Sequence, residues 1–264
     1  ENPACTRLLL DAGASVTGTN ALFRSLDFDD IATFRLLLDH AKGAEEPQGG
    51  RLLFWAIRRR RSADHIRALL DAGADASATT PDGTSAHVQA LRYGLIEAAA
   101  LLAPGGTETA VEDLLLAACA RGDAAAAQRI LDERPDLPGA LDETRLRMLP
   151  ELAAEGVSHA VRLMADIGWP LDTRGGDWRA SALNHAVFRG DADMARDLLE
   201  RGADWRDEHG FGDNACGTLS WASCNRPVAE GDWVACAEVL RAHGMPPGRR
   251  DPINTECVIV AGKS

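Results

Sequence analysis

The segment A-S-A-L-N-H-A-V-F-R-G-D-A-D-M-A-R-D-L-L-E-R-G-A-D, residues 180–204, determines the fold of this chain. Apolar residues recur in it at spacings of three and four, which indicates two successive amphipathic helices. The apolar positions are Leu183, Ala186 and Val187 in the first helix, and Met194, Leu198 and Leu199 in the second. Helices this short cannot bury an apolar face alone, so the segment needs similar neighbours to pack against.

Polar residues and glycines mark where these two helices begin and end. Ser181 and Asp191 stand before the two apolar patterns, where a side-chain oxygen can accept a hydrogen bond from the first helical turn. Gly190 and Gly202 follow the patterns, and glycine readily adopts the left-handed conformation that ends many helices. The segment therefore predicts one helix–turn–helix unit.

The same unit recurs along the chain. A pair of apolar residues ends each second helix, and these pairs repeat with a mean spacing of about 33 residues. A second marker, the apolar residue that opens the first helix, precedes the pair by 15 residues in most units. The pairs are Leu9-Leu10, Leu37-Leu38, Leu69-Leu70, Leu101-Leu102, Ile130-Leu131, Met164-Ala165, Leu198-Leu199 and Val239-Leu240. Two spacings that agree in this way predict a repeat protein.

In these residues the chain resembles the ankyrin-repeat family, whose units end in an apolar helix followed by L-L-x-x-G-A-D. That ending is present at residues 9–14, 69–75 and 198–204, whereas the family's T-P-L-H motif is nowhere intact. The resemblance covers nearly the whole chain. It implies an all-α ankyrin-repeat solenoid of about eight helix–turn–helix units, with a truncated first unit, over residues 1–247.

Segments outside the repeats carry weaker expectations. Residues 248–264 are expected to be a linker with a C-terminal tail, either the start of a further unit or a docked strand. The Gly-rich, charged stretch 41–50 is expected to be a mobile loop. Because the chain opens with Glu1, inside a repeat, we expect that an N-terminal segment is missing.

Composition narrows the possible partners. The net charge of −12 disfavours nucleic acid and anionic lipid as partners, and no apolar run is long enough to span a membrane. Arginine far outnumbers lysine, which favours a GC-rich, bacterial source. The six cysteines form no C-x-x-C pair and are expected to be free thiols in a reducing compartment. We expect a cytoplasmic protein, with a secreted effector as the alternative.

The resemblance also implies where a partner would bind. Ankyrin arrays bind partners on a concave face made by the turn tips and the exposed side of each first helix. The residues that fall on such positions are Phe28, Arg58, Arg59, Arg92, Arg121, Asp177, Trp178, Phe188, Arg189, Asp213, Asn214 and Asn225. Another protein or a peptide is the expected partner, and the sequence leaves the oligomeric state open.

Aromatic residues concentrate in the last two repeats. Trp178 and Phe188 fall on exposed positions and are expected to contact the partner, since aromatic side chains dominate binding hot spots. Trp55 and Trp221 fall where the helix is expected to face the core. The groove of the last two repeats is therefore the predicted main interaction surface.

The arginine run 58–61 has two interpretations. Four arginines at one helix end could bind phosphate or an acidic peptide, or they could form a solvated turn. The second interpretation is favoured, because no extended basic face accompanies the run.

A catalytic role finds little support in the sequence. Chemically active side chains gather in the last repeats, but no metal-ligand spacing, phosphate loop or dinucleotide motif is present, so no cofactor and no metal are expected. The members of this cluster are His185, Asp191, His209, Asp213, Cys216 and Cys224. The sequence thus favours a recognition scaffold, namely an adaptor, an inhibitor or an effector docking module. The alternative is a site in the same groove that binds or modifies a small molecule or peptide.

Overall fold

The computed structural model describes residues 2–41, 50–103, 105–250 and 257–260. Contacts divide the chain into two compact units, residues 1–117 and 118–264, and the boundary falls inside one helix, α9 (Val111–Arg121). Each unit is considered by itself below. The loop predicted over 41–50 lies, apart from its two end residues, outside the described residues.

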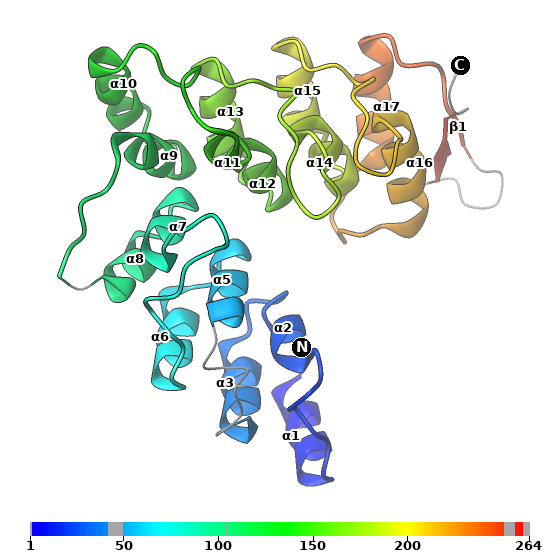
Figure 1. Ribbon diagram of the computed structural model, residues 1–264. Helices are drawn as coiled ribbons and strands as arrows, with labels where there is room; N and C mark the ends of the chain where they lie inside the picture. The colour runs from blue at the N-terminus through cyan, green and yellow to red at the C-terminus, as the bar shows by residue number, and fades with distance from the viewer. Residues whose placement is uncertain (1, 42–49, 104, 251–256, 261–264) are drawn as a thin grey trace. The chain divides into compact units, whose positions relative to one another are not determined.

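The first unit consists of helices joined in pairs by short turns (Figure 1). Helix α1 stands alone as the second member of an incomplete pair, and it packs on α3. First helices pack on first helices, and second helices on second helices. The helices before α9 are α1 (Pro3–Asp11), α2 (Ala21–Ser25), α3 (Ile31–His40), α5 (Gly50–Arg58), α6 (Ala63–Asp71), α7 (Ala86–Arg92) and α8 (Ile96–Leu102).

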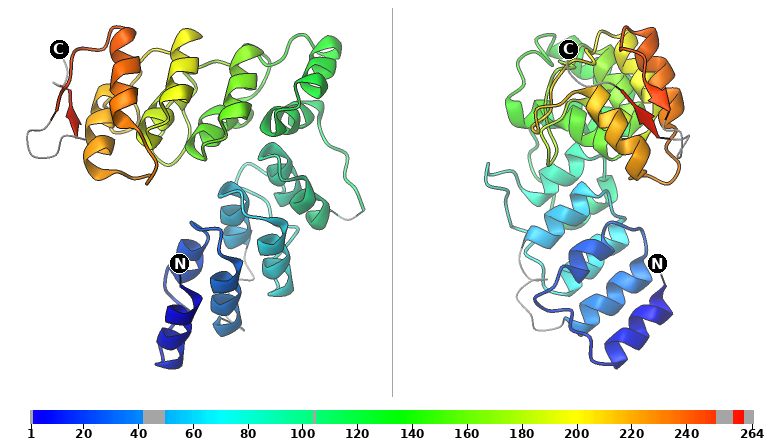
Figure 2. Two further views of the ribbon diagram at one scale, coloured as in Figure 1. Left: turned by 180° about the vertical axis from the view of Figure 1, so that it is seen from behind. Right: turned by 90° about the vertical axis from the view of Figure 1, so that its right-hand side faces the viewer.

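The second unit continues the same arrangement. Helices α12, α14 and α16 lie side by side in one layer, and α13, α15 and α17 form the other layer (Figure 2). The helices after α9 are α10 (Ala124–Glu133), α11 (Glu143–Leu146), α12 (Met148–Ala154), α13 (Ser158–Asp166), α14 (Ala182–Arg189), α15 (Ala192–Glu200), α16 (Ala215–Asn225) and α17 (Trp233–Ala242). With α1 as an incomplete first repeat, the described helices form eight successive helix–turn–helix repeats, as predicted.

The predicted helix boundaries at residues 180–204 are confirmed. Ser181 Oγ accepts a hydrogen bond from the Asn184 amide (3.3 Å), and Asp191 Oδ1 accepts one from the Met194 amide (2.9 Å). Gly190 ends α14 with a φ of 70°. The local sequence therefore specified where the two helices of this pair begin and end.

The C-terminal tail docks as a strand. Strand β1 (Arg249–Arg250) pairs antiparallel with β2 (Val258–Ile259), and β2 packs against α16 and α17. Ser223 Oγ accepts a hydrogen bond from the Val258 amide (2.9 Å), and Ser220 Oγ accepts one from the Val260 amide (3.0 Å). The described residues of 248–264 thus form a docked strand, whereas 251–256 and 261–264 lie outside the described residues.

A disulfide joins this tail to α16. Cys224, near the end of α16, is bonded to Cys257, directly before β2. The expectation that all six cysteines are free thiols is therefore wrong for this pair. Its partners are 33 residues apart in the chain, and only the docking of the tail brings them together.

We predict that Gly190→Ala destabilises the protein more than Gly202→Ala does. Both glycines have a positive φ, but a Cβ at Gly190 would lie 2.6 Å from the Gly231 Cα, whereas a Cβ at Gly202 would meet nothing within 4 Å. Gly202→Ala therefore tests backbone strain alone, at a cost of about 1 kcal/mol, and Gly190→Ala should cost about 3 kcal/mol. Urea unfolding of the three proteins measures the difference, and equal losses of stability would contradict the close approach.

Candidate functional site

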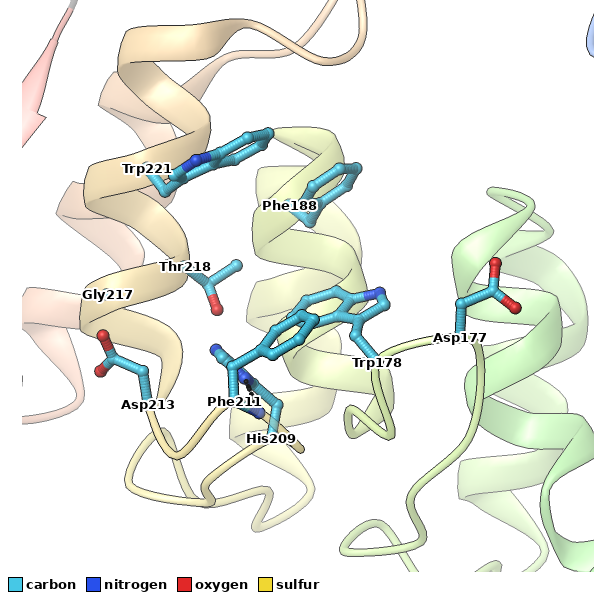
Figure 3. A pocket seen from close by; sticks show the side chains of 9 residues that line it. All are labelled: Asp177, Trp178, Phe188, His209, Phe211, Asp213, Gly217, Thr218 and Trp221. Carbon is cyan, nitrogen blue, oxygen red and sulfur yellow. Dashed lines mark hydrogen bonds between the residues drawn. The ribbon is translucent and has the colours of Figure 1, made fainter.

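A pocket of about 610 Å³ opens between α14, α16 and the loops that precede them (Figure 3). Aromatic rings make most of its wall, and two carboxylates stand among its lining residues. The lining residues are Asp177, Trp178, Phe188, His209, Phe211, Asp213, Gly217, Thr218 and Trp221. All of them belong to the second unit, so the pocket is complete within that unit.

The aromatic wall is a connected set of rings. Phe188 of α14 and Trp221 of α16 stack with their centroids 5.6 Å apart and their planes 10° apart, and Trp178 lies 5.5 Å from Phe188 (Figure 3). On its other sides Trp178 meets the edges of His185 (4.8 Å) and His209 (4.9 Å). Ring contacts of this kind fix the position of each ring, so the wall is preorganised.

A buried hydrogen-bond network holds α14 and α16 at the distance that leaves the pocket between them. The Asn184 amide nitrogen donates to Ser181 Oγ (3.2 Å) and to the Asp207 carbonyl (3.1 Å). Its amide oxygen accepts from Thr218 Oγ1 (2.8 Å), and Thr218 lines the pocket. Because Asn184 is fully buried, losing one partner would leave an unsatisfied polar group, which makes this spacing specific.

Asp213 adds a carboxylate to the residues that line the pocket, on the side of Gly217 (Figure 3). Its Oδ1 accepts a hydrogen bond from the Asn214 amide (2.8 Å), and Asn214 caps α16. Gly217 makes room for this carboxylate, since a Cβ there would fall 1.9 Å from Asp213 Oδ2. No lysine or arginine is among the residues that line the pocket.

His209 contributes a neutral ring to the same wall. Burial lowers the pKa of His209, an effect that Arg174 reinforces and that Asp213 and Glu208 oppose. A lowered pKa favours the uncharged imidazole at neutral pH. The carboxylate of Asp213 is thus the charged group that this side of the pocket presents.

Four of the twelve residues predicted to bind a partner line this pocket: Asp177, Trp178, Phe188 and Asp213. Three others have structural roles at its edges. Asn214 caps α16 through the Cys216 amide (2.9 Å), Asn225 Nδ2 donates to the Trp221 carbonyl (2.8 Å), and Arg189 Nη1 donates to the Ala154 carbonyl (2.9 Å).

The remaining predicted residues lie outside this pocket. Phe28 is exposed between α2 and α3, and Arg121 ends α9, 3.5 Å from Asp123. Arg92, which repeat position assigns to the surface, is 4% exposed, and its Nε donates to Asp113 Oδ1 (2.8 Å). A buried guanidinium that satisfies a buried carboxylate is not available to a partner, so the structure corrects that assignment.

The side chains of the arginine run 58–61 contact other residues of the first compact unit, residues 1–117. Arg58 and Arg59 lie over the Trp55 ring, with their guanidinium carbons 5.9 and 4.5 Å from its centroid, and Arg59 is also 3.2 Å from Asp27. Arg60 donates to the Tyr93 carbonyl, and Arg61 donates to the Arg59 carbonyl. The run therefore packs against its own repeat and against the repeats before and after it.

Sequence reasoning misplaces one pocket residue and misses others. It assigns Trp221 to the core, yet the residue is 53% exposed. It does not include Phe211 among the binding residues, and Phe211 is 81% exposed. The sequence does carry a signal for Phe211, because an aromatic residue between Gly210 and Gly212 stands in a tight loop that cannot bury it.

The catalytic-looking cluster does not converge on one centre. Asp191 caps α15, and Cys224 is in the disulfide. Burial first, and Asp213 second, raise the pKa of Cys216 to about 11, so this thiol is protonated and a poor nucleophile at neutral pH. Within the described parts of the chain, no group of three or more potential ligands could hold a metal ion.

Comparison with known proteins adds only general similarity. No family model and no curated protein matches the chain. Among solved structures, the ankyrin repeat domain of human ASB11 is similar at 15% identity, over 86% of this chain and 98% of that one, with a TM-score of 0.39. The ankyrin repeat domain of Bcl-3, described as a unique member of the IkappaB protein family, is similar at 16% identity, over 76% and 94%, with a TM-score of 0.34.

The fold class rests on the chain's own repeats. In each unit, helix pairs stack at the period seen in the sequence, so the fold is an all-α array of ankyrin-like helix–turn–helix repeats, as predicted. Among the described helices, none is both long and apolar enough to cross a membrane.

Thiol labelling tests the cysteine chemistry of the site. In the native protein we expect iodoacetamide to modify exposed Cys5 rapidly. The buried Cys119, Cys216 and Cys236 should react far more slowly, because burial raises their pKa values to about 12, 11 and 12. After denaturation without reductant, mass spectrometry should count four modified cysteines, and six with reductant. Labelling of native Cys216 as fast as Cys5 would contradict this environment.

Proposed function

We propose that this protein is a recognition scaffold that binds another protein or a peptide through the aromatic pocket of its second unit. The observation that carries the proposal is the exposure of Trp221 and Phe211 beside Trp178 and Phe188. Folded proteins rarely leave contiguous aromatic surface in water, and such patches mark binding sites. Buried aromatic anchors also contribute most of the binding free energy in protein interfaces.

The pocket's own features support a protein or peptide ligand. The ring wall offers a large apolar contact area, and the carboxylates of Asp177 and Asp213 add directional polar contacts. The net charge of −12 and the absence of lysine and arginine from the pocket lining weigh against nucleic acid. Whether the scaffold acts as an adaptor, an inhibitor or an effector docking module depends on that partner.

One observation favours a second candidate function. The volume of about 610 Å³ falls within the range of small-molecule sites, roughly 300–1,000 Å³, so the pocket could hold a free small molecule. Against a modifying activity, Cys216 is not among the lining residues and its pKa is raised. Within this alternative, binding of a small molecule is therefore better supported than its chemical modification.

The location of the protein is also part of the proposal. Disulfides persist in oxidising compartments and are rare in the cytosol, so the Cys224–Cys257 bond supports a secreted protein over a cytoplasmic one. The arginine-rich composition supports a bacterial source.

Peptide display tests the function and requires no identified partner. A random peptide library is selected on the immobilised protein, and the affinities of enriched peptides are measured for four proteins. These are the wild type, Trp178→Ala/Phe188→Ala, Trp221→Ala, and the control Phe28→Ala. Removing pocket anchors should weaken binding at least 30-fold, from the usual hot-spot cost of about 2 kcal/mol or more.

The Phe28→Ala control should leave the affinity unchanged. Phe28 is as exposed as Trp221 but lies outside the pocket. Thermal melts show whether each variant is folded. The proposal fails if no peptide is enriched, or if the pocket variants and Phe28→Ala bind the peptides with the same affinity as the wild type.

A further inference from the structure

The repeats contain an internal comparison for Trp221. Trp55 and Trp221 occupy the same place in their units, two residues after the apolar residue that opens the first helix, Leu53 or Leu219. Five and six residues after Leu53 stand Arg58 and Arg59, whose guanidinium groups cover the Trp55 ring. The same positions after Leu219 hold Cys224 and Asn225. Trp221 therefore lacks the cover that its counterpart receives from its own helix.

A second indole repeats the pattern. The guanidinium carbon of Arg206 lies 4.3 Å from the centroid of the Trp205 ring. Trp169 and Trp233 are buried and need no cover. Within the described residues, Trp178 and Trp221 are the remaining indoles, and no cation–π contact is found on either ring.

The carboxylates of the pocket favour a cationic ligand, because no lysine or arginine lines the pocket. Asp213 is a lining residue whose carboxylate lies toward Gly217 of α16 (Figure 3), it forms no salt bridge among the described residues, and no cationic side chain lines the pocket. An apolar ligand would cover that carboxylate without offering it a partner, which is unfavourable. A cationic ligand would satisfy both the carboxylate and the electron-rich faces of the rings.

We propose that the pocket binds an arginine side chain of the partner, with its guanidinium against the aromatic wall and paired with the carboxylate of Asp213. This inference rests on the proposed function and names the group that it recognises. Arginine fits better than lysine, because the guanidinium is planar, weakly hydrated and able to stack on an indole while it donates two hydrogen bonds to a carboxylate. The arginine of the partner would thus make with the pocket rings the cation–π contact that Arg58 and Arg59 make with Trp55.

Fluorine NMR of the whole chain labelled with 5-fluorotryptophan tests this inference directly. The probe is N-acetyl-arginine methylamide, and three analogues of it carry citrulline, leucine or trimethyl-lysine. We expect the arginine probe to shift the Trp178 and Trp221 signals, with a dissociation constant on the order of 1 mM for so small a ligand. The Trp205 signal is an internal control and should not move, because Arg206 already covers that ring.

Citrulline keeps the shape of arginine without its charge and should bind at least fivefold more weakly. Asp213→Asn should weaken arginine binding by a similar factor, whereas Glu200→Gln, which removes an exposed carboxylate at the end of α15, should not. Trp221→Leu provides a second test at an exposed position, and a thermal melt shows whether the variant is folded. It should also weaken binding of the arginine probe at least fivefold.

The outcomes separate this inference from the proposed function. If leucine or trimethyl-lysine shifts the pocket signals at lower concentration than arginine, the pocket binds side chains but the arginine assignment is wrong. Equal binding of arginine and citrulline, or unchanged binding to Asp213→Asn, would also overturn it. If no probe moves these two signals, the arginine inference fails, and the peptide selection on the pocket variants decides the proposed function.

Discussion

The whole structure depends on the burial of apolar faces between neighbouring helix pairs, since no pair in this chain can bury its own. In the pair α14/α15, Leu183, Leu198 and Met194 are almost completely buried, and both helices pack on helices of the adjacent pairs. Among the described residues, the pair α16/α17 has a helical neighbour, α14/α15, on one side only. The tail covers it instead, because Val258 and Val260 are buried against α16. The described part of the tail therefore covers apolar surface of α16 and α17.

Stacking alone would not hold a pocket open, since apolar helix faces close on each other. The second unit keeps α14 and α16 at a defined spacing by burying polar groups between them. The side-chain amide of Asn184 on α14 accepts a hydrogen bond from Thr218 on α16 and donates to Ser181 and to the Asp207 carbonyl. Phe188 of α14 and Trp221 of α16 then stack ring on ring (Figure 3). Each of the two helices thus contributes one ring to the wall of the pocket. The polar layer fixes the spacing of the two helices, and the rings supply the exposed aromatic surface.

The sequence predicted those features that depend on local spacing. Helix ends at Ser181, Gly190 and Asp191 follow from the chemistry of single residues, and the positions of Trp178 and Phe188 follow from the repeat. Trp221 was misplaced although helix geometry argues against a core position. Residues two apart on an α-helix point about 200° away from each other, so a residue two after buried Leu219 faces outward.

Other features could not be predicted, because they depend on contacts between distant residues. The burial of Arg92 requires Asp113, which lies 21 residues away in the next pair. The disulfide requires the tail to return to α16 across 33 residues. The repeat period contains no sign of either contact. Repeat position therefore assigned Arg92 to the surface, and the absence of a C-x-x-C pair led to the expectation of six free thiols.

Helix α16 links the docked tail to the pocket. Ser220, Ser223 and Cys224 hold the tail, whereas Gly217, Thr218 and Trp221 line the pocket, so the two sets alternate along the same turns. The helix is thereby held from two sides, by α14 through Thr218 and by the tail through the two serines and the disulfide. A ligand that enters the pocket then meets rings whose backbone is already fixed, and the entropy that binding would lose in ordering them is already lost on folding. The docked tail therefore also preorganises the site.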